Sequence, residues 1–427
     1  MTHIKEYIDK LVNEGYNTKQ IGVISSEYEI TRQAYHNKDS ILLFSLEEFD
    51  EIVCYTNIIS TRKLLYKALN VRNDLEAYEK LLYALSNPLP LETVNFNEHF
   101  KETNYTLEDI PFIKYYREDG GHYLTSSIIA SCYGEICNAS FHRMMRINKQ
   151  KAAVRIVPRH LYYLVRKYHS EGKPAPVAIV LGLHPAAEIA TASSPPLGVY
   201  EFSVAARLLG NNKAVKTPIH GIPVPVYASI ILEGIINQTE APEGPFVDIL
   251  RLTDKQRKQP VFKLEAVYVN KNYPPYYHAI VPGLEEHIYL MGFPREPLIY
   301  DSLRKITSEI KGIRLTPGSG GWLHAVISIK KTRRGEAKNV GLAVLTGHPS
   351  VKHVVIVDDD IDIDDPYSIE WAIATRVRGS EDVIILRNLR GSTLDPRSDE
   401  GIGDKMIIDA TKPFDEPWEY YRRAEIP

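Results

Sequence analysis

Cysteine is scarce in this sequence, which holds only Cys54, Cys132 and Cys137 among 427 residues. The spacing of the last two differs from Cys-x-x-Cys, so we expect no disulfide framework. Such sparing use of cysteine favours a reducing compartment, and we therefore expect a cytoplasmic protein.

Several other features are missing from the chain. Lys and Arg number 51 against 54 Asp and Glu, and no long basic run occurs, which argues against nucleic acid as a partner. No stretch approaches the roughly 20 apolar residues that span a bilayer, so we expect no membrane segment. Residues 1–16 carry apolar side chains at helical spacing, which predicts an amphipathic helix rather than a signal peptide.

The composition that remains is that of a globular protein, with 44% hydrophobic and 25% charged residues. A chain of 427 residues is too long for one ordinary core, so we expect two or three domains.

The pattern of apolar residues changes twice along the chain. Residues 1–96 alternate strand-like and helical stretches, which predicts an α/β domain that ends near the prolines of 87–92. Residues 97–290 hold short β-rich runs and helical insertions, as is typical of a β-barrel or sandwich. Strand and helix alternate again over 291–427, which predicts a second α/β domain. The expected fold class is α+β and multidomain.

Some polar residues stand out against this apolar background. Asn138 offers an amide oxygen, His142 an imidazole and Arg143 a planar cation, all within one strand-like segment. Taken alone, such residues belong to a surface or to packing more often than to a site.

A second group of polar residues surrounds a predicted helix start at Pro158. His160 is expected in the first turn, near exposed backbone N–H groups, with Arg155 and Arg159 beside it. This segment fits a phosphate site and a plain solvated helix start equally well. Glu201 is the one acid of another apolar stretch, and Asn, His and Glu together suit Mn²⁺ or Mg²⁺, although their separation matches no compact metal motif.

Three other features carry less weight. Residues 316–322 are glycine-rich but lack the Lys-Ser/Thr of a P-loop, which predicts a flexible connection. The aspartates of 358–365 follow a buried strand, and we expect them to cap the next helix and face water. Lys405 has no sequence partner that assigns it a role.

The segment 239–248 reads Thr-Glu-Ala-Pro-Glu-Gly-Pro-Phe-Val-Asp and follows an apolar strand. Its acids Glu240, Glu243 and Asp248 frame a Gly-Pro turn. Composition alone makes this an acidic surface turn.

From about residue 120 onward, these segments resemble in order the UbiD family of reversible decarboxylases. Residues 231–248 match the family pattern Leu-Glu-Gly…Pro-Glu-Gly-Pro-Tyr/Phe-Gly-Asp/Glu. The other similar segments are Asn-Ala-Ser-Phe-His-Arg-Met at 138–144, Val-Pro-Arg-His-Leu at 157–161, and the stretches 199–210, 351–365, 369–376, 392–396 and 404–413. Residues 1–95 match only loosely.

The resemblance implies a prenylated FMN cofactor, held through its phosphate by Mn²⁺ and K⁺. By position, the metal ligands would be Asn138, His160 and Glu201. The residues lining the flavin would be Phe141, His142, Arg143, Arg155 and Arg159. It also implies a central split β-barrel between α/β regions, a homo-oligomer (dimer or hexamer) built through the C-terminal domain, and a UbiX-type flavin prenyltransferase as cofactor supplier.

The resemblance also implies a catalytic set of Arg143, Glu243 and Asp248. Loss of CO₂ leaves a carbanion, which a modified flavin can delocalise as an electron sink. The same carbon must then be protonated by an acid that keeps its proton near neutral pH. Two carboxylates that share one arginine give this arrangement. We expect Asp248 to donate the proton, Glu243 to be its partner and Arg143 to orient both.

Two departures from the family pattern bear on the substrate, a small carboxylic acid. Ser229 stands where many members have an acid, and Val247 stands where they have glycine. The short chain is most like a compact archaeal branch that decarboxylates trans-anhydromevalonate 5-phosphate to isopentenyl phosphate. Basic residues that could receive the substrate phosphate are Arg146, Lys149, Lys213 and Lys216.

Three alternatives stay open at this point. The substrate could be an aromatic acid such as a 4-hydroxy-3-polyprenylbenzoate. The chain could bind the cofactor without turnover, or it could be a metal-dependent hydrolase that uses the aspartates of 358–365.

Overall fold

The computed structural model describes residues 2–424. The chain forms two compact units, Met1–Leu290 and Met291–Pro427. Both mix helices and strands, so the expected multidomain architecture of mixed helices and strands is confirmed, while the finer α+β class with a split barrel stays a prediction. The expected boundary between residues 96 and 97 lies inside the first unit and stays a prediction.

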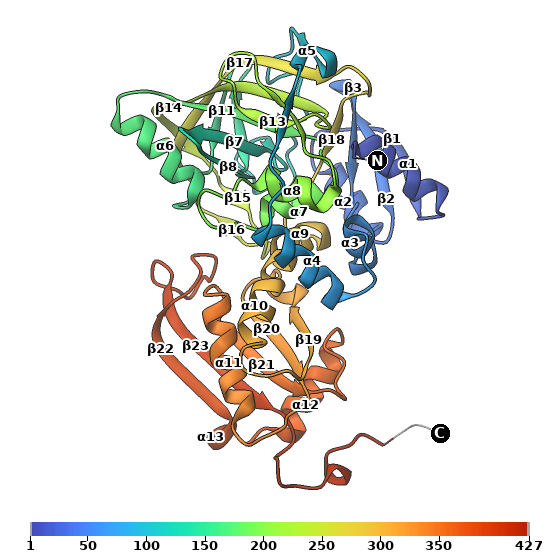
Figure 1. The fold of residues 1–427 in the computed structure, drawn as a ribbon, viewed down its shortest axis with the longest axis vertical. Coiled ribbons are helices and arrows are strands. Elements are labelled where there is room, and N and C mark those ends of the chain that lie inside the picture. The colour runs from blue at the N-terminus through green and yellow to red at the C-terminus, as the bar shows by residue number, and fades with distance from the viewer. Residues whose placement is uncertain (1, 425–427) are drawn as a thin grey trace. The chain divides into compact units, whose positions relative to one another are not determined.

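A nine-stranded sheet dominates the first unit (Figure 1). Its order is β6-β9-β10-β17-β14-β11-β7-β8, and β5 pairs with β17 outside this path. The strands are β5 (Phe100–Thr103), β6 (Tyr123–Leu124), β7 (Ile128–Tyr133), β8 (Ile136–Phe141), β9 (Met144–Asn148), β10 (Lys151–Val154), β11 (Ala175–Leu181), β14 (Ile230–Glu243) and β17 (Arg257–Asn270). Within the described residues the two ends of this path, β6 and β8, do not pair with each other. β11 and the first half of β14 are apolar and buried almost throughout, as expected for strands covered on both faces.

Three helices pack against the β7–β8 end of this sheet (Figure 1): α6 (His160–Ser170), α7 (Pro185–Ala192) and α8 (Glu201–Leu209). α6 begins at His160, so the expected helix start after Pro158 is confirmed. α8 begins at Glu201, and its C-cap Gly210 has a φ of 66°, a left-handed conformation that glycine adopts without strain. Glu201, the first residue of α8, contacts Asn138 and Ala139 of β8.

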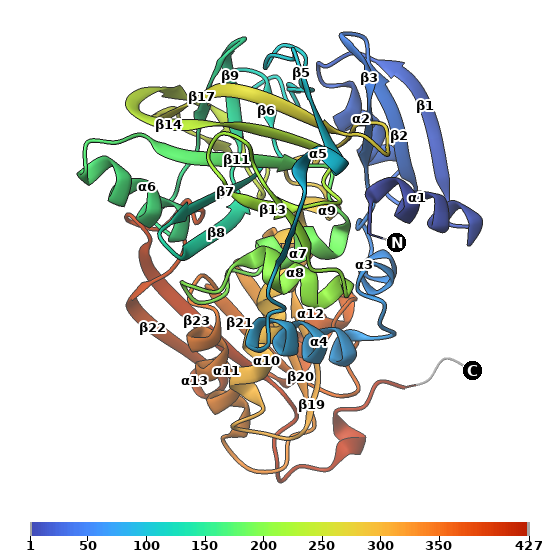
Figure 2. The same ribbon diagram turned by 45° about the horizontal axis from the view of Figure 1, so that its top comes forward.

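A second sheet of the first unit has the order β1-β2-β3-β18 (Figure 2), with β1 (Thr18–Ile24), β2 (Ile41–Leu46), β3 (Phe49–Thr56) and β18 (Tyr276–His278). Its helices are α1 (Ile4–Asn13), α2 (Glu29–His36), α3 (Arg62–Leu69) and α4 (Asp74–Ser86). α1 buries Ile4, Tyr7, Ile8 and Leu11, which confirms the amphipathic helix predicted there. The last strand comes from far along the chain, so residues 1–96 do not complete this sheet alone.

The shorter elements of the first unit include the β15–β16 hairpin, which carries part of the candidate site. They are β4 (Glu92–Val94), α5 (Phe96–His99), β12 (Lys213–Lys216), β13 (Pro223–Pro225), β15 (Phe246–Val247), β16 (Thr253–Asp254) and α9 (Glu285–Gly292).

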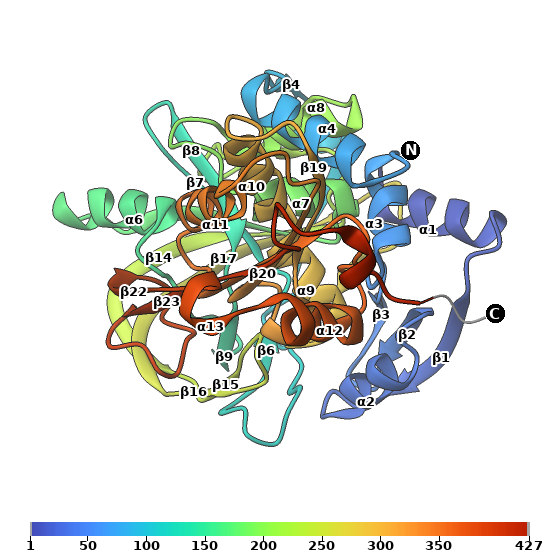
Figure 3. The same cartoon turned by 90° about the horizontal axis from the view of Figure 1, so that it is seen from below.

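The second unit is built on a five-stranded sheet of order β19-β20-β21-β23-β22 (Figure 3). The strands are β19 (Ile310–Leu315), β20 (His324–Ile329), β21 (His353–Asp358), β22 (Val383–Arg390) and β23 (Ile402–Ala410), and the helices are α10 (Glu296–Leu303), α11 (Glu336–Gly347), α12 (Pro366–Arg376) and α13 (Gly379–Asp382). β20, β21 and β23 run parallel. Gly341 of α11 packs against Ile407 on one face, whereas Ile369 and Ala372 of α12 pack against the other face.

Two expectations about the second unit had different outcomes. Asp365 caps α12 by accepting hydrogen bonds from the backbone N–H groups of Tyr367 and Ser368, as predicted. Asp358 does not face water, because it is buried and lies 2.8 Å from the Arg376 guanidinium. The prediction was wrong for Asp358, since the buried Arg376 lies 18 residues further along the chain and cannot be paired with it from sequence pattern alone.

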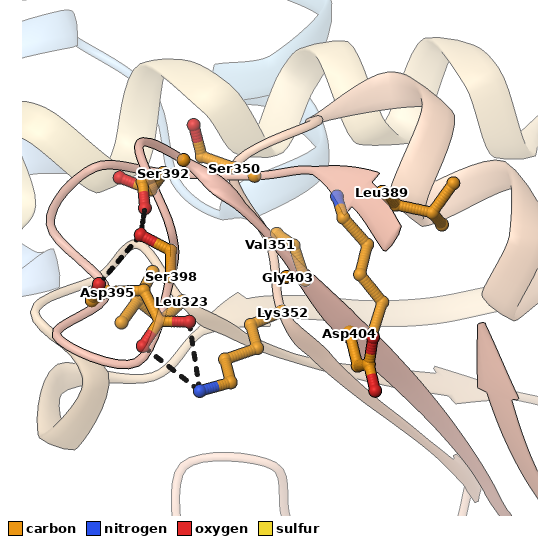
Figure 4. Close-up of a pocket in the computed structure, with 13 residues that line it drawn as sticks. Leu323, Ser350, Val351, Lys352, Leu389, Ser392, Asp395, Ser398, Gly403 and Asp404 are labelled. Atoms are coloured by element: carbon orange, nitrogen blue, oxygen red, sulfur yellow. Dashed lines mark hydrogen bonds and ion pairs between the residues drawn. The ribbon is translucent and has the colours of Figure 1, made fainter. Parts of the chain in front are cut away.

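Lys405 also lies in the second unit. Its ammonium group is buried and donates a hydrogen bond to the Pro349 carbonyl. It lines a small hollow (Figure 4), in which Lys352 pairs with Asp395 and the Ser398 hydroxyl donates to the carbonyl of Asp395. This arrangement satisfies local polar groups and assigns Lys405 no chemical role.

The cysteines require a correction. Cys132 and Cys137 face each other across the β7–β8 hairpin and form a disulfide, whereas Cys54 is free and buried. The expectation of no disulfide framework did not foresee this single bridge, which forms because directly opposed positions of a hairpin bring two side chains together. Within residues 2–424, no helix is both long and apolar enough to cross a bilayer.

Candidate active site

The centre of the candidate site is an ion pair between the half-buried Arg143 and the buried Glu243. Arg143 follows β8, and its Nε and Nη2 donate to the two Glu243 oxygens at 2.8 and 3.0 Å. The Glu243 side chain is 0% exposed. Burial opposes the charge of Arg143, but its bonds to Glu243 and to Asp254 raise the pKa of the guanidinium. The residue that composition alone placed in a surface turn is thus fixed inside the unit.

The turn after Glu243 is held by close backbone packing. β14 ends at Glu243, and Gly244 follows with a φ of 98°, which favours glycine. The Gly120 N–H donates to the Pro245 carbonyl at 2.7 Å. A Cβ at Gly120 would lie 2.3 Å from the Gly244 oxygen, so only glycine fits there. This packing fixes the position of Phe246, whose ring centroid lies 4.2 Å from the Arg143 guanidinium carbon.

Asp248 lies five residues beyond Glu243 and is only 8% exposed. One of its oxygens accepts hydrogen bonds from the backbone N–H groups of Leu250 and Leu252, at 2.8 and 3.1 Å. Burial raises the pKa of Asp248, more than these N–H groups and the Arg143 charge lower it. No hydrogen bond joins Asp248 to Arg143 in the part of the chain that is described, so Arg143 orients Glu243 directly but not Asp248.

A residue that the sequence did not single out takes the second position on Arg143. Asp254 accepts from Arg143 Nη2 at 3.0 Å, and its other oxygen lies 2.5 Å from Arg257 Nη1. It reaches Arg143 because β15 and β16 form a hairpin in which Phe246 pairs with Asp254. Strands β15 and β16 are only two residues long, so the sequence does not reveal how they pair or that this pairing brings Asp254 to Arg143.

Arg143 keeps one free side in this arrangement. Its Nε and Nη2 groups are occupied by Glu243 and Asp254, and no hydrogen bond from Nη1 to a described residue is present. Hydrogen bonds from a guanidinium N–H to a carboxylate or phosphate are strengthened by the opposite charges. The site can therefore bind an anion at Nη1 while Glu243 keeps the guanidinium in place.

His287 of α9 is a further residue that sequence reasoning missed. Its Nδ1 accepts from the Gly283 N–H at 3.1 Å. Burial and the nearby Arg143 charge lower the pKa of His287 to about 4, so this imidazole is neutral near pH 7. No sequence pattern connected the start of α9 with Arg143.

Two of the three expected metal ligands are brought together. Asn138 on β8 donates to one oxygen of Glu201 at 2.6 Å, and the Ala139 N–H donates to the other at 2.7 Å. Glu201 is 1% exposed and receives only neutral donors, so burial raises its pKa to about 8. His160 opens α6, which packs on the same strand, but no hydrogen bond joins it to Glu201 or Asn138 among the described residues.

This donor set fits a hard divalent cation. A buried carboxylate without a positive partner is costly, and a cation beside Glu201 would supply the missing charge. Amide and carboxylate oxygens with an imidazole nitrogen suit Mn²⁺. Within residues 2–424, no cluster of three or more His, Cys, Asp or Glu residues has the arrangement of a metal site, so the set depends on Asn138 as a ligand.

The expected flavin-lining residues share one region around the end of β8. Phe141 ends this strand opposite Ile128. His142 receives a contact from the Ser140 hydroxyl at 2.9 Å and contacts the Arg155 carbonyl at 3.0 Å. Burial lowers the pKa of His142 to about 4, which keeps the ring neutral.

Arg155 and Arg159 supply positive charge that the described residues do not neutralise. Burial lowers the pKa of both, and the charges of Arg257 and Arg143 lower that of Arg155 further. Neither forms a salt bridge with a described carboxylate. Unbalanced guanidinium groups beside the start of a helix are a suitable site for a phosphate group.

Comparison with known proteins agrees with these observations. Residues 90–285 match the UbiD 3-octaprenyl-4-hydroxybenzoate carboxy-lyase Rift-related domain, and residues 288–410 match the corresponding C-terminal domain. The chain belongs to the UbiD family, and the resemblance seen in the sequence is confirmed.

Individual relatives extend this result over nearly the whole chain. The anhydromevalonate phosphate decarboxylase of Aeropyrum pernix is 42% identical over 99% of this chain and 96% of its own. The anhydromevalonate phosphate decarboxylase of Methanothermobacter thermautotrophicus is 38% identical over 96% of this chain and 97% of its own. The UbiD-class enzyme HmfF from Pelotomaculum thermopropionicum, solved in complex with FMN, is 33% identical with a TM-score of 0.93, covering 99% of this chain and 97% of that one.

Proposed function

We propose that this protein is a prenylated-FMN-dependent decarboxylase that converts trans-anhydromevalonate 5-phosphate to isopentenyl phosphate. The observation that carries the proposal is the Arg143–Glu243 pair, which leaves Nη1 free in the same unit as Asp248, an acid whose pKa is raised by burial. Relatives that match this chain almost end to end are named for this activity.

The reaction replaces one substituent of an alkene carbon. The bond from that carbon to the carboxylate breaks and releases CO₂, and a proton takes its place, so no oxidant or reductant is consumed. When bound, the prenylated flavin supplies an electron sink for the carbon that loses CO₂. The chain itself must hold the substrate, exclude water and deliver the proton.

We assign the role of proton donor to Asp248. Its pKa is raised by burial, which favours the protonated acid that a donor requires near neutral pH. The oxygen that accepts from Leu250 and Leu252 is fixed by the backbone, which leaves the second oxygen to carry the proton. Glu243 holds Arg143, and Arg143 Nη1 would hold the substrate carboxylate before it is lost.

The cofactor assignments follow the same residues. Asn138, His160 and Glu201 would hold Mn²⁺ at the flavin phosphate, with K⁺ beside it, and Arg155 and Arg159 would add the charge that this phosphate needs. Phe141, His142 and Arg143 would lie along the flavin.

Other elements of the proposal extend the family assignment. We propose that the nine-stranded sheet corresponds to the family's split β-barrel, that a UbiX-type flavin prenyltransferase supplies the cofactor, and that the protein is a cytoplasmic homo-oligomer. The homo-oligomer is supported by HmfF, which is 30% identical to this chain and has been solved in an evolved dimeric form with prFMN.

The substrate phosphate needs basic residues other than those assigned to the flavin. Arg146 on β9 is half-buried, and its guanidinium lies over the Phe112 ring. Lys149 lies in the β9–β10 turn, and Lys213 and Lys216 are exposed on β12, which belongs to a different sheet.

An aromatic acid such as a 4-hydroxy-3-polyprenylbenzoate is the second candidate substrate. A specific observation supports it, because the phenolic acid decarboxylase of Bacillus subtilis is 31% identical over 76% of this chain and 72% of its own.

The test uses protein co-expressed with a flavin prenyltransferase, whose cofactor is identified by absorption spectrum and mass. We expect CO₂ and isopentenyl phosphate from trans-anhydromevalonate 5-phosphate, and no CO₂ from aromatic acids. The opposite pattern would overturn the substrate. Asp248→Asn should bind the same cofactor and turn over very slowly, whereas Glu240→Gln, which removes an exposed acid of the same segment, should leave turnover unchanged.

A further inference from the structure

Asp254 is the one strong contact of Arg143 that the proposed function leaves without a role. It accepts from Nη2 at 3.0 Å, on the same nitrogen that donates to Glu243. The side chain of Asp254 is 19% exposed, against 0% for Glu243, so it approaches Arg143 from the less buried side. A carboxylate needed only to neutralise Arg143 would be redundant, since Glu243 already binds it through two hydrogen bonds.

Three contacts together fix the plane of the guanidinium. Glu243 binds its Nε–Nη2 edge, Asp254 binds the second Nη2 hydrogen, and the Phe246 ring lies 4.2 Å from its carbon. The free Nη1 group must then point in one direction, away from both carboxylates. Without Asp254, the guanidinium could swing about the Glu243 bonds, and the direction of Nη1 would be lost.

The hairpin that carries Asp254 also carries the link to Asp248. Phe246 pairs with Asp254 and Val247 with Thr253, so Asp248 follows directly after the paired residues. The Asp248 N–H donates to the Leu252 carbonyl at 2.9 Å, which closes the turn between the two strands. Asp248 and Asp254 therefore belong to one small rigid unit.

We propose that Asp254 is a positioning residue for the proton-transfer step, acting through Arg143 and on Asp248 without touching the reacting atoms. This inference rests on the proposed function, because it takes Asp248 as the proton donor.

The charges around the two aspartates set the expected direction. Asp254 faces Arg143, Arg257 and Arg155, and its negative charge adds to the effect of burial in raising the pKa of Asp248, against the opposing charge of Arg143. Asp119, which accepts from the Val247 N–H at 2.9 Å, is a further acid beside the hairpin.

Neutralising Asp254 would therefore favour ionised Asp248 in two ways. One negative neighbour is removed, and Arg143 becomes less fully compensated. A proton donor works below its pKa, so the fall of kcat with rising pH should move to lower pH in Asp254→Asn. We expect a loss of kcat of at least about threefold on the alkaline limb, with KM changing less than kcat.

The experiment compares kcat–pH profiles of the flavin-loaded wild type, Asp254→Asn, Asp254→Glu and Glu240→Gln. Asp254→Glu keeps the negative charge, so its kcat should fall at the same pH as in the wild type, even if its absolute rate is lower. Glu240→Gln removes one negative charge from the exposed part of β14 and should leave the alkaline limb of the kcat–pH profile where it is. A uniform drop of kcat in Asp254→Asn at every pH, with the limb unmoved, would show a merely structural role and overturn the proposal.

A second readout does not depend on turnover. In protein without cofactor, ¹³C-labelled aspartate side chains can be titrated by NMR, with Asp248 assigned by its absence in Asp248→Asn. The Asp248 titration should move to lower pH in Asp254→Asn and stay in place in Glu240→Gln. An unmoved titration contradicts the inference alone. Normal turnover of Asp248→Asn would contradict the proton donor of the proposed function instead, and the titration would still report on Asp254.

Discussion

Replacing Glu243 by glutamine should weaken the first unit more than any exposed ion-pair substitution. The Glu243 side chain is fully buried and binds the half-buried Arg143 at 2.8 and 3.0 Å, so the substitution removes the charge of the closer carboxylate and one of the hydrogen bonds to the guanidinium. Removing one partner of a buried ion pair typically costs ~3–5 kcal/mol. Asp254 and the Phe246 ring still contact Arg143, and the amide oxygen can accept one bond, so we expect the lower part of this range, ~3 kcal/mol.

The position of the tryptophans decides the assay. All three, Trp322, Trp371 and Trp418, lie in the second unit, so their fluorescence does not report on unfolding around Glu243. Hydrogen exchange of the amides of β14 and β17, measured by mass spectrometry, reports on the right region. We expect those amides to exchange faster in Glu243→Gln, while the tryptophan transition stays where it is.

A double-mutant cycle supplies the control. Arg143→Met combined with Glu243→Gln removes the charge at both positions, and the double variant should be more stable than the sum of the single changes predicts. A cost for Glu243→Gln below about 1 kcal/mol, which is the range of exposed pairs, would refute the view of this pair as a buried, water-excluded contact.

Three further predictions concern other parts of the molecule. Asp358→Asn should destabilise the second unit by ~2–4 kcal/mol because it leaves buried Arg376 with a weaker partner, and tryptophan fluorescence during urea unfolding should report it, since Arg376 lies beside two tryptophan rings. Arg155→Ala and Arg159→Ala should each weaken FMN binding by on the order of tenfold in equilibrium titration, and unchanged affinity would remove them from the phosphate site. Burial opposes the charge of His278, yet Glu188 and Glu286, each 2.9 Å away, raise its pKa to about 10. A pKa raised by folding stabilises the folded state fully below about pH 6.5, so β18 amides should lose protection as the pH rises from there through 10, and His278→Gln should flatten this dependence.

Local patterns predicted much of the fold. The amphipathic α1, the helix start at His160 and the cap at Asp365 each depend on residues close in sequence, and such short-range rules act in the isolated segment. The pairing of Cys132 with Cys137 and of Asp358 with Arg376 depends on register and on packing between elements, which no local rule fixes.

The residues of the candidate site were likewise predictable only in part. Glu243 and Arg143 are 100 residues apart, and only the family resemblance connected them before the structure placed them together. Asp254 escaped notice because its role depends on a hairpin of two-residue strands, which are too short to show a periodic pattern. Residues that act on Arg143 from a second side are therefore found by geometry and not by motif.

The small sheet near the N-terminus has a consequence for biosynthesis. β3 ends at Thr56, but its neighbour β18 begins at Tyr276, about 220 residues later. At ~5–20 residues per second, a ribosome needs roughly 10–45 s to make the missing strand. During that interval, the edge of β3 and the apolar side chains beside it have no native partner. The first unit therefore cannot finish folding before most of it has left the ribosome.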